Sequence, residues 1–133
     1  MHSSIYRMLA ILPLLLVPGI GTLSESPRIR VTHVSGLSAV KTQQENPIAL
    51  HLHNPTGRAI AIVGLPGTCG EHCCISSEDS GHRTIPPGAT VAIPARLRTG
   101  RQPGPFAVTA MLYLDDAGRL DSITHVIQGE SVP

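Results

Sequence analysis

Three cysteines lie within six residues, in the run Cys69-Gly70-Glu71-His72-Cys73-Cys74, and the chain has no other cysteine. Thiolates act as nucleophiles and as soft metal ligands, so this run concentrates the reactive chemistry of the sequence. In an oxidising compartment an odd number of cysteines leaves at least one thiol unpaired within the chain. The run could therefore form a disulfide, bind a metal or take part in thiol–disulfide exchange.

A structural disulfide with one spare thiol is the plainest interpretation of the run. A bond between Cys73 and Cys74 would strain the peptide that joins them, so Cys69 is expected to pair with either Cys73 or Cys74. The closed loop would be short, and its contribution to stability would be about 2 kcal/mol or less.

A soft-metal site is the alternative that would give the run a function. Thiolates of Cys69, Cys73 and Cys74, with His72 or the nearby His82 as nitrogen donor, offer ligands for copper or zinc. The spacing is not that of a Cys-x-x-Cys knuckle. In thiol–disulfide exchange, Cys69 or Cys73 would attack, and a protonated His72 would be the neighbour able to lower a thiol pKa.

Histidines form a second candidate site. His51 and His53 lie two residues apart and would project from the same face of one strand, where they could bind copper together with His33 or His125. The alternative is that they are ordinary polar residues on the solvent face of a sheet.

Motifs of known catalytic chemistry are missing from the sequence. Asp115 and Asp116 fall in an expected hairpin turn, where Asp caps the backbone, and no acid or base partner lies at a defined spacing. The chain has no Gly-x-Ser-x-Gly elbow, phosphate-binding glycine loop or His-Glu-x-x-His pair. We expect that the protein is not an enzyme.

Residues 1–26 have the pattern of a secretory signal peptide or signal anchor. Arg7 precedes the apolar run from Met8 to Val17, which is shorter than the roughly 18 to 20 residues of a membrane span. If the segment is not cleaved, residues 8–23 could tether the protein to a membrane. We expect an extracytoplasmic protein, periplasmic or on the cell surface, whose residues 27–133 form one domain.

Apolar residues in this domain alternate with a period of two, which is typical of half-buried strands. Turn residues separate the runs, as in Pro86-Pro87-Gly88. The pattern predicts an all-β, immunoglobulin-like antiparallel β-sandwich of about seven strands, with weak strands near 36–41 and 76–84. A hairpin with a four-residue turn at 115–118 is also predicted. The strong runs are 28–34, 47–53, 58–63, 90–97, 106–114 and 120–128.

Charge and aromatic content argue against a nucleic-acid partner. The formal net charge is +1 without a basic run, and one Phe with two Tyr provide no platform on which bases could stack.

The order of the turns over residues 46–130 resembles the bacterial domain of unknown function 1573 family, which is similar to the immunoglobulin-like domains of ciliary and centrosomal Hydin-type proteins. The resemblance implies the fold, and that family brings no established activity with it. The family has Cys-Gly-Cys followed by Thr where this chain has the longer run from Cys69 to Cys74. The turns that carry the resemblance are Asn54-Pro55-Thr56-Gly57, Cys69-Gly70, Ile85-Pro86-Pro87-Gly88, Thr99-Gly100, Gly104-Pro105-Phe106, Asp115-Asp116 and Val126-Ile127-Gln128-Gly129.

We therefore expect a binding or structural module that contacts another extracytoplasmic protein. The contact would use a sheet edge or the loops around Cys69 to Cys74, because exposed edges of small sandwiches can accept an added strand. The competing expectation is an extracytoplasmic copper or zinc protein that uses Cys69, His72, Cys73 and Cys74.

Overall fold

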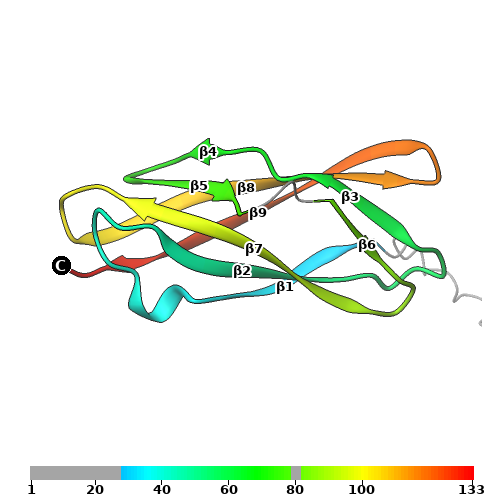
Figure 1. Cartoon of the computed structure of the whole chain (residues 1–133), viewed down its shortest axis with the longest axis horizontal. Helices are drawn as coiled ribbons and strands as arrows, with labels where there is room; N and C mark the ends of the chain where they lie inside the picture. Colours follow the sequence, from blue (N-terminus) through cyan, green and yellow to red (C-terminus); the bar gives the residue numbers. More distant parts are fainter. Residues whose placement is uncertain (1–27, 79–81) are drawn as a thin grey trace, which may run out of the picture.

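The structure, a computed structural model, describes residues 28–78 and 82–133 and is nearly all β within them (Figure 1). The predicted signal or anchor segment, 1–26, lies outside the described residues. Among those described, no helix has the length and apolarity needed to cross a membrane. The elements are β1 (Arg30–Ser35), the 3-10 helix η2 (Leu37–Ala39), β2 (Asn46–His53), β3 (Ile60–Gly64), β4 (Thr68–Cys69), β5 (Cys73–Ser77), β6 (Arg83–Ile85), β7 (Thr90–Thr99), β8 (Gly104–Asp116) and β9 (Arg119–Ser131).

The strands form two antiparallel sheets. One has five strands in the order β1-β2-β7-β5-β4, and the other has four in the order β6-β3-β8-β9. Both run along the long axis of the molecule (Figure 1). The predicted antiparallel β-sandwich is confirmed at this level.

Alternation of side chains builds the core between the sheets, as predicted from the sequence. In β2 the side chains of Ile48, Leu50 and Leu52 are buried, while His51 and His53 are only partly covered. The partner strand β7 buries Ile93, Ala95 and Leu97, and β8 buries five residues in the same alternating way. These are Phe106, Val108, Ala110, Leu112 and Leu114.

The β8–β9 hairpin is confirmed, but its turn is shorter than predicted. The strands stay paired as far as Asp116 and Arg119, so Ala117 and Gly118 alone form the loop. Both have positive φ, 55° and 87°, which suits the twist of a two-residue hairpin. Asp115, expected within the turn, accepts a hydrogen bond at Oδ1 from the Gly118 amide at 2.8 Å.

The predicted strand count is too low, since nine strands lie in the described residues. The segment expected as a weak strand at 36–41 forms the 3-10 helix η2 after Gly36, whose φ is +92°. The weak run at 76–84 is divided between the end of β5 and β6. The two-residue strand β4 was missed because two residues are too few to show a period.

The chain crosses from one sheet to the other between β3 and β4. β3 pairs with β8 in the four-stranded sheet, its register shifts between Ile62 and Gly64, and β4 then pairs with β5 in the five-stranded sheet. On the opposite side, the amide of Thr42 donates to the carbonyl of Val132 at 2.9 Å and the amide of Gln43 to that of Thr99 at 3.3 Å. Backbone segments thus connect the two sheets on both sides of the sandwich.

Candidate functional site

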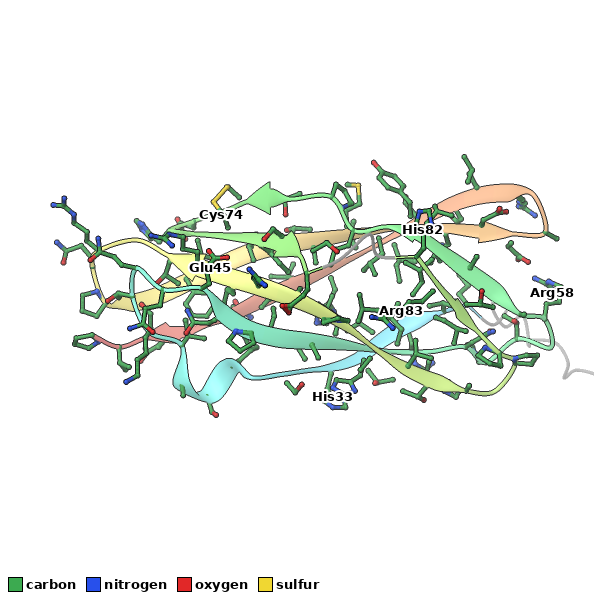
Figure 2. All side chains as sticks on the ribbon, viewed as in Figure 1. His33, Glu45, Arg58, Cys74, His82 and Arg83 are labelled. Carbon is green, nitrogen blue, oxygen red and sulfur yellow. A yellow bond between two sulfur atoms is a disulfide. The ribbon has the colours of Figure 1, made fainter. Side chains whose placement is uncertain are left out.

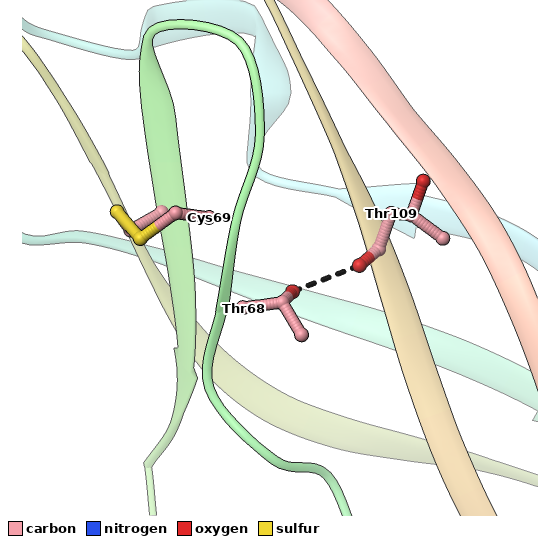
Figure 3. Close-up of a disulfide and its surroundings, with 4 residues drawn as sticks. Thr68, Cys69 and Thr109 are labelled. Atoms are coloured by element: carbon pink, nitrogen blue, oxygen red, sulfur yellow. Dashed lines mark hydrogen bonds between the residues drawn. A yellow bond between two sulfur atoms is a disulfide. The ribbon is translucent and has the colours of Figure 1, made fainter.

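The cysteine run forms a short hairpin in which β4 and β5 are joined covalently. Cys69 and Cys74 are directly opposite each other in the antiparallel register, and their sulfurs form a disulfide with the Cα atoms 3.9 Å apart (Figure 3). The structure thus pairs Cys69 with Cys74, one of the two partners that the sequence left open. Both residues are exposed, so the disulfide lies on the outer face of the five-stranded sheet.

Backbone hydrogen bonds hold the turn between these two cysteines. The Gly70 amide donates to the Cys73 carbonyl at 2.8 Å, and the Glu71 carbonyl accepts from the Ala107 amide at 3.1 Å. The His72 carbonyl accepts a hydrogen bond from the Gly100 amide at 3.3 Å. His72 itself has a φ of 63°, which is unusual for a residue with a side chain. The turn therefore contacts both β8 and the end of β7.

Gly70 is required by close packing against β8. A Cβ atom at this position would overlap the carbonyl oxygen of Ala107 and lie 2.8 Å from the Cα of Val108. Beside it, the Thr68 hydroxyl donates to the Thr109 carbonyl at 2.8 Å (Figure 3). The disulfide hairpin is thereby attached to β8 of the second sheet.

Cys73 is the free cysteine of the described residues, and it is buried on the inner face of β5 with 5% of its surface exposed. Burial raises the pKa of the thiol, because an apolar environment disfavours the charged thiolate. Strand alternation places Cys73 on the opposite face from its neighbour Cys74. A protonated, enclosed thiol is a poor nucleophile, so this geometry does not favour the predicted attack by Cys73 in thiol–disulfide exchange.

The four residues predicted as metal ligands are not brought together in this oxidised form. Cys69 and Cys74 are bonded to each other, Cys73 faces the core, and His72 lies exposed in the turn. His82, the other donor considered, lies far along the sandwich from Cys74 (Figure 2). Within 28–78 and 82–133, no three His, Cys, Asp or Glu side chains are arranged to hold a metal ion.

The histidine pair on β2 does share one face, as predicted, but its side chains bond to separate neighbours. His51 stacks on His33 of β1, with ring centroids 4.0 Å apart, and its Nε2 lies 3.0 Å from the Ser35 hydroxyl. The Nδ1 of His53 instead lies 3.0 Å from the Thr90 hydroxyl. His125 belongs to the other sheet, opposite the buried Ala110.

A cleft that the sequence did not indicate lies at the other end of the sandwich, with a volume of about 670 Å³. The β2–β3 loop, the β8–β9 hairpin and the start of the described chain form its walls. Figure 2 shows Arg58 at this end and Cys74 toward the opposite one. The segments that line the cleft are far apart in the sequence, so no local motif reveals the cleft. The lining residues are Arg28, Pro55, Thr56, Gly57, Arg58, Asp116, Arg119 and Asp121.

Ion pairs organise the cleft. The guanidinium of Arg58 donates two hydrogen bonds to the Asp116 carboxylate, from Nε to Oδ1 at 3.0 Å and from Nη2 to Oδ2 at 2.6 Å. Arg28 reaches Asp121 at 3.2 Å. The hydrogen bonds from Arg58, followed by the positive charges of Arg58 and Arg119, lower the pKa of Asp116 despite partial desolvation. The pKa of Arg58 is raised by the same pairing.

A buried asparagine shapes the loop that carries Arg58. The Asn54 side chain is fully buried, and its amide nitrogen donates to the carbonyls of Arg58 at 2.7 Å and Ile85 at 2.9 Å. Its Oδ1 accepts hydrogen bonds from the amide of Thr56 at 2.9 Å and from its hydroxyl at 2.6 Å. One side chain therefore supplies the hydrogen bonds that this irregular segment lacks in its own backbone.

Comparisons with known proteins add no relative. No protein-family model matches the chain, and a search of the curated proteins finds no similar sequence. The resemblance to the domain of unknown function 1573 family therefore stays a prediction.

Proposed function

We propose that this chain is a non-enzymatic, extracytoplasmic, immunoglobulin-like module that binds an extended segment of another protein by adding it as a strand to β9. One observation carries the proposal. β9 is 13 residues long, lies at the edge of its sheet and, among the described strands, pairs only with β8. The row of backbone groups along an unpaired edge is a template for another strand.

The other sheet edges are much shorter. β4 has two residues and β6 has three, and β1, with six, has a register irregularity between Val31 and His33. Short or irregular edges are common ways in which proteins prevent unwanted pairing. β9 contains no proline and no lysine, so it lacks two of the usual protections.

Apolar side chains accompany the free edge of β9. Leu120 and Val126 on β9 are 75% and 55% exposed, and Tyr113 on the neighbouring β8 is 44% exposed. The pairing places Tyr113 opposite Ser122, between the levels of Leu120 and Val126. Such side chains could contact alternate residues of an added strand, as strand addition requires for specificity.

Further features support an exported location and the finer fold assignment. An exposed disulfide between β4 and β5 suits an oxidising compartment, where such bonds persist. The signal-like residues 1–26 favour the same compartment, and residues 8–23 would tether the protein to the membrane if the segment is not cleaved. The two packed antiparallel sheets are compatible with the immunoglobulin-like fold that the resemblance to the domain of unknown function 1573 family implies.

A photocrosslinking amino acid placed at position 126 tests the proposal in cells that export the protein. We expect a discrete adduct with one extracytoplasmic protein, lost when Leu120→Lys is added because a charge on an edge strand opposes pairing. The matched control carries the crosslinker at Ser76, an exposed residue of the five-stranded sheet, with no adduct. Equal adducts from both positions, or none, would refute the proposal.

Two other outcomes would identify an alternative function. Adducts formed only from position 72 would move the binding site to the loop around Cys69 to Cys74. Reduced protein that keeps stoichiometric copper or zinc in native mass spectrometry, and loses it with Cys73→Ser, would support the soft-metal alternative.

A further inference from the structure

The cleft around Arg58 is a second surface, chemically different from the edge of β9. A ligand site in this cleft would not depend on strand addition at β9. Three arginines and two aspartates line the cleft, which gives a local formal charge of +1 (three positive minus two negative). Its volume of about 670 Å³ falls within the range of about 300 to 1,000 Å³ that is usual for small-molecule sites. The hydrogen-bonding groups of the lining that lack a partner determine which kind of ligand the cleft can bind.

Acceptors in the cleft are already occupied. Both oxygens of Asp116 accept hydrogen bonds from Arg58. Asp121 accepts from Arg28 at one oxygen and from the Ser122 amide at the other, at 2.8 Å. With every carboxylate oxygen engaged, the cleft is poorly prepared for a metal cation or an ammonium group.

Donors, in contrast, are in excess. A guanidinium group carries five N–H donors, so the three arginines bring about fifteen. Arg58 uses two of them and Arg28 uses one in the bonds to the aspartates. Arg119 lies opposite Asp116 in the hairpin, but its guanidinium forms no hydrogen bond or salt bridge with any described residue. The unused capacity of the cleft is therefore cationic and donor-rich.

The guanidinium of Arg58 is also held in place before any ligand arrives. Asp116 fixes it through two parallel hydrogen bonds, and Asn54 fixes the backbone carbonyl of Arg58. A preorganised arginine loses less side-chain entropy when it binds, which is a general source of affinity.

We propose that this cleft binds a small oxyanion, a carboxylate or phosphate group, with Arg119 as its principal donor and Arg28 and Arg58 completing the contacts. Planar guanidinium groups bind both oxyanions through paired hydrogen bonds. The ligand occupies the open side of the cleft, where it shares the guanidinium groups with Asp116 and Asp121 and does not displace them.

The test is a titration of the full chain, followed by amide chemical shifts in NMR, with inorganic phosphate and separately with succinate at constant ionic strength. We expect saturable shifts in residues 55–58 and 116–121. Arg119→Gln should weaken binding about tenfold or more, as expected for loss of hydrogen bonds to a charged group. Arg101→Gln is the matched control: Arg101 is exposed in the β7–β8 loop and lies outside the cleft, so the variant changes the net charge equally.

Each result decides the proposal. Saturation by either anion that Arg119→Gln weakens and Arg101→Gln preserves supports it, and the anion that saturates first identifies the class of ligand. Shifts that never saturate, or that both variants reduce equally, would reflect general charge screening and overturn it. Photocrosslinking at position 126 is unaffected by either anion result, so the two proposals can fail separately.

Discussion

The two ends of the sandwich are closed by different means. At the cysteine end, a disulfide and backbone hydrogen bonds connect the hairpin 69–74 to β7 and β8. At the arginine end, side chains do the same work, since Asn54 ties the loop to β6 and Arg58 pairs with the β8–β9 hairpin. The arginine end, where side chains make the connection, contains an open, charged cleft.

The two ends differ in how far their polar and reactive side chains are already engaged. The residues with the most reactive side chains, the cysteines, are used up in a bond or buried, and the arginines at the other end keep unused donors. The region that draws attention in the sequence is therefore the one whose cysteine side chains are not available to a ligand. The ligand chemistry that we propose depends on arginines from separate segments, which no sequence motif links.

Removal of Asn54 is expected to have the largest effect. Asn54→Ala would remove the donor to the buried Ile85 carbonyl and the acceptor of the Thr56 amide, while the Arg58 carbonyl keeps the Thr56 hydroxyl as a donor. Each unsatisfied buried group costs about 1–3 kcal/mol, so we expect a loss of about 4 kcal/mol in the free energy of unfolding. Urea denaturation measures it. A loss below about 1 kcal/mol would mean that Asn54 does not hold this end together.

A methyl group added at Gly70 tests how tightly the cysteine end is packed. Gly70→Ala should destabilise by about 3 kcal/mol, because the new Cβ overlaps the β8 backbone at Ala107 and Val108. Gly57→Ala in the arginine end is the control, since a Cβ there meets nothing within 4 Å, and it should change stability by less than about 0.5 kcal/mol. Similar losses in both variants would contradict the contrast between the two ends.

Loss of the disulfide should matter less than loss of Asn54. The bond joins residues five apart, and a loop this short contributes about 2 kcal/mol. The double variant Cys69→Ser, Cys74→Ser should therefore unfold at lower urea concentration and become insensitive to reductant. Cys73→Ala keeps the disulfide, and its stability should still depend on reductant; if it does not, Cys73 takes part in the pairing.

Thr99 offers a stabilising change at the cysteine end. Its hydroxyl is buried and has no hydrogen-bond partner among the described residues. Thr99→Val removes this unsatisfied group without changing the shape and should add about 1 kcal/mol to the free energy of unfolding. Thr109→Val, at an exposed position of β8, should be nearly neutral. Equal effects in thermal unfolding would show that β propensity, and not burial, is responsible.

The smallest effect should be the acid sensitivity of the arginine end. The pKa of Asp116 is lowered in the folded state, so its ion pair contributes stability above the unfolded pKa of about 3.9. That contribution is lost as the pH falls through the lower folded value. Arg58→Gln should remove this part of the pH dependence, seen as a flatter stability curve between pH 5 and the acid limit. An unchanged curve would show that the pair is fully screened by solvent.

Those parts of the fold that depend on the periodicity of apolar residues could be predicted from the sequence. The alternation in β2, β7 and β8 is regular, so the buried residues and the sandwich followed from it. β4 could not be predicted because two residues carry no period, and its existence depends on contacts with β5 and β8. The pairing of Cys69 with Cys74 required the register of the hairpin. The cleft required Arg58 and Asp116, which are 58 residues apart in the chain, to meet.

Strand β2 begins on the buried Asn46 and is followed directly by the buried Asn54. Asn46 accepts from the Lys41 amide and donates to the carbonyls of Lys41, Gln44 and Leu97, as Asn54 does for its own loop. The two side chains are fixed at a separation that only a strand of this length can span. An inserted or deleted residue within β2 would remove one asparagine from its partners in addition to reversing the faces of the strand. Insertions and deletions in this segment should therefore be tolerated far less than in the exposed β7–β8 loop.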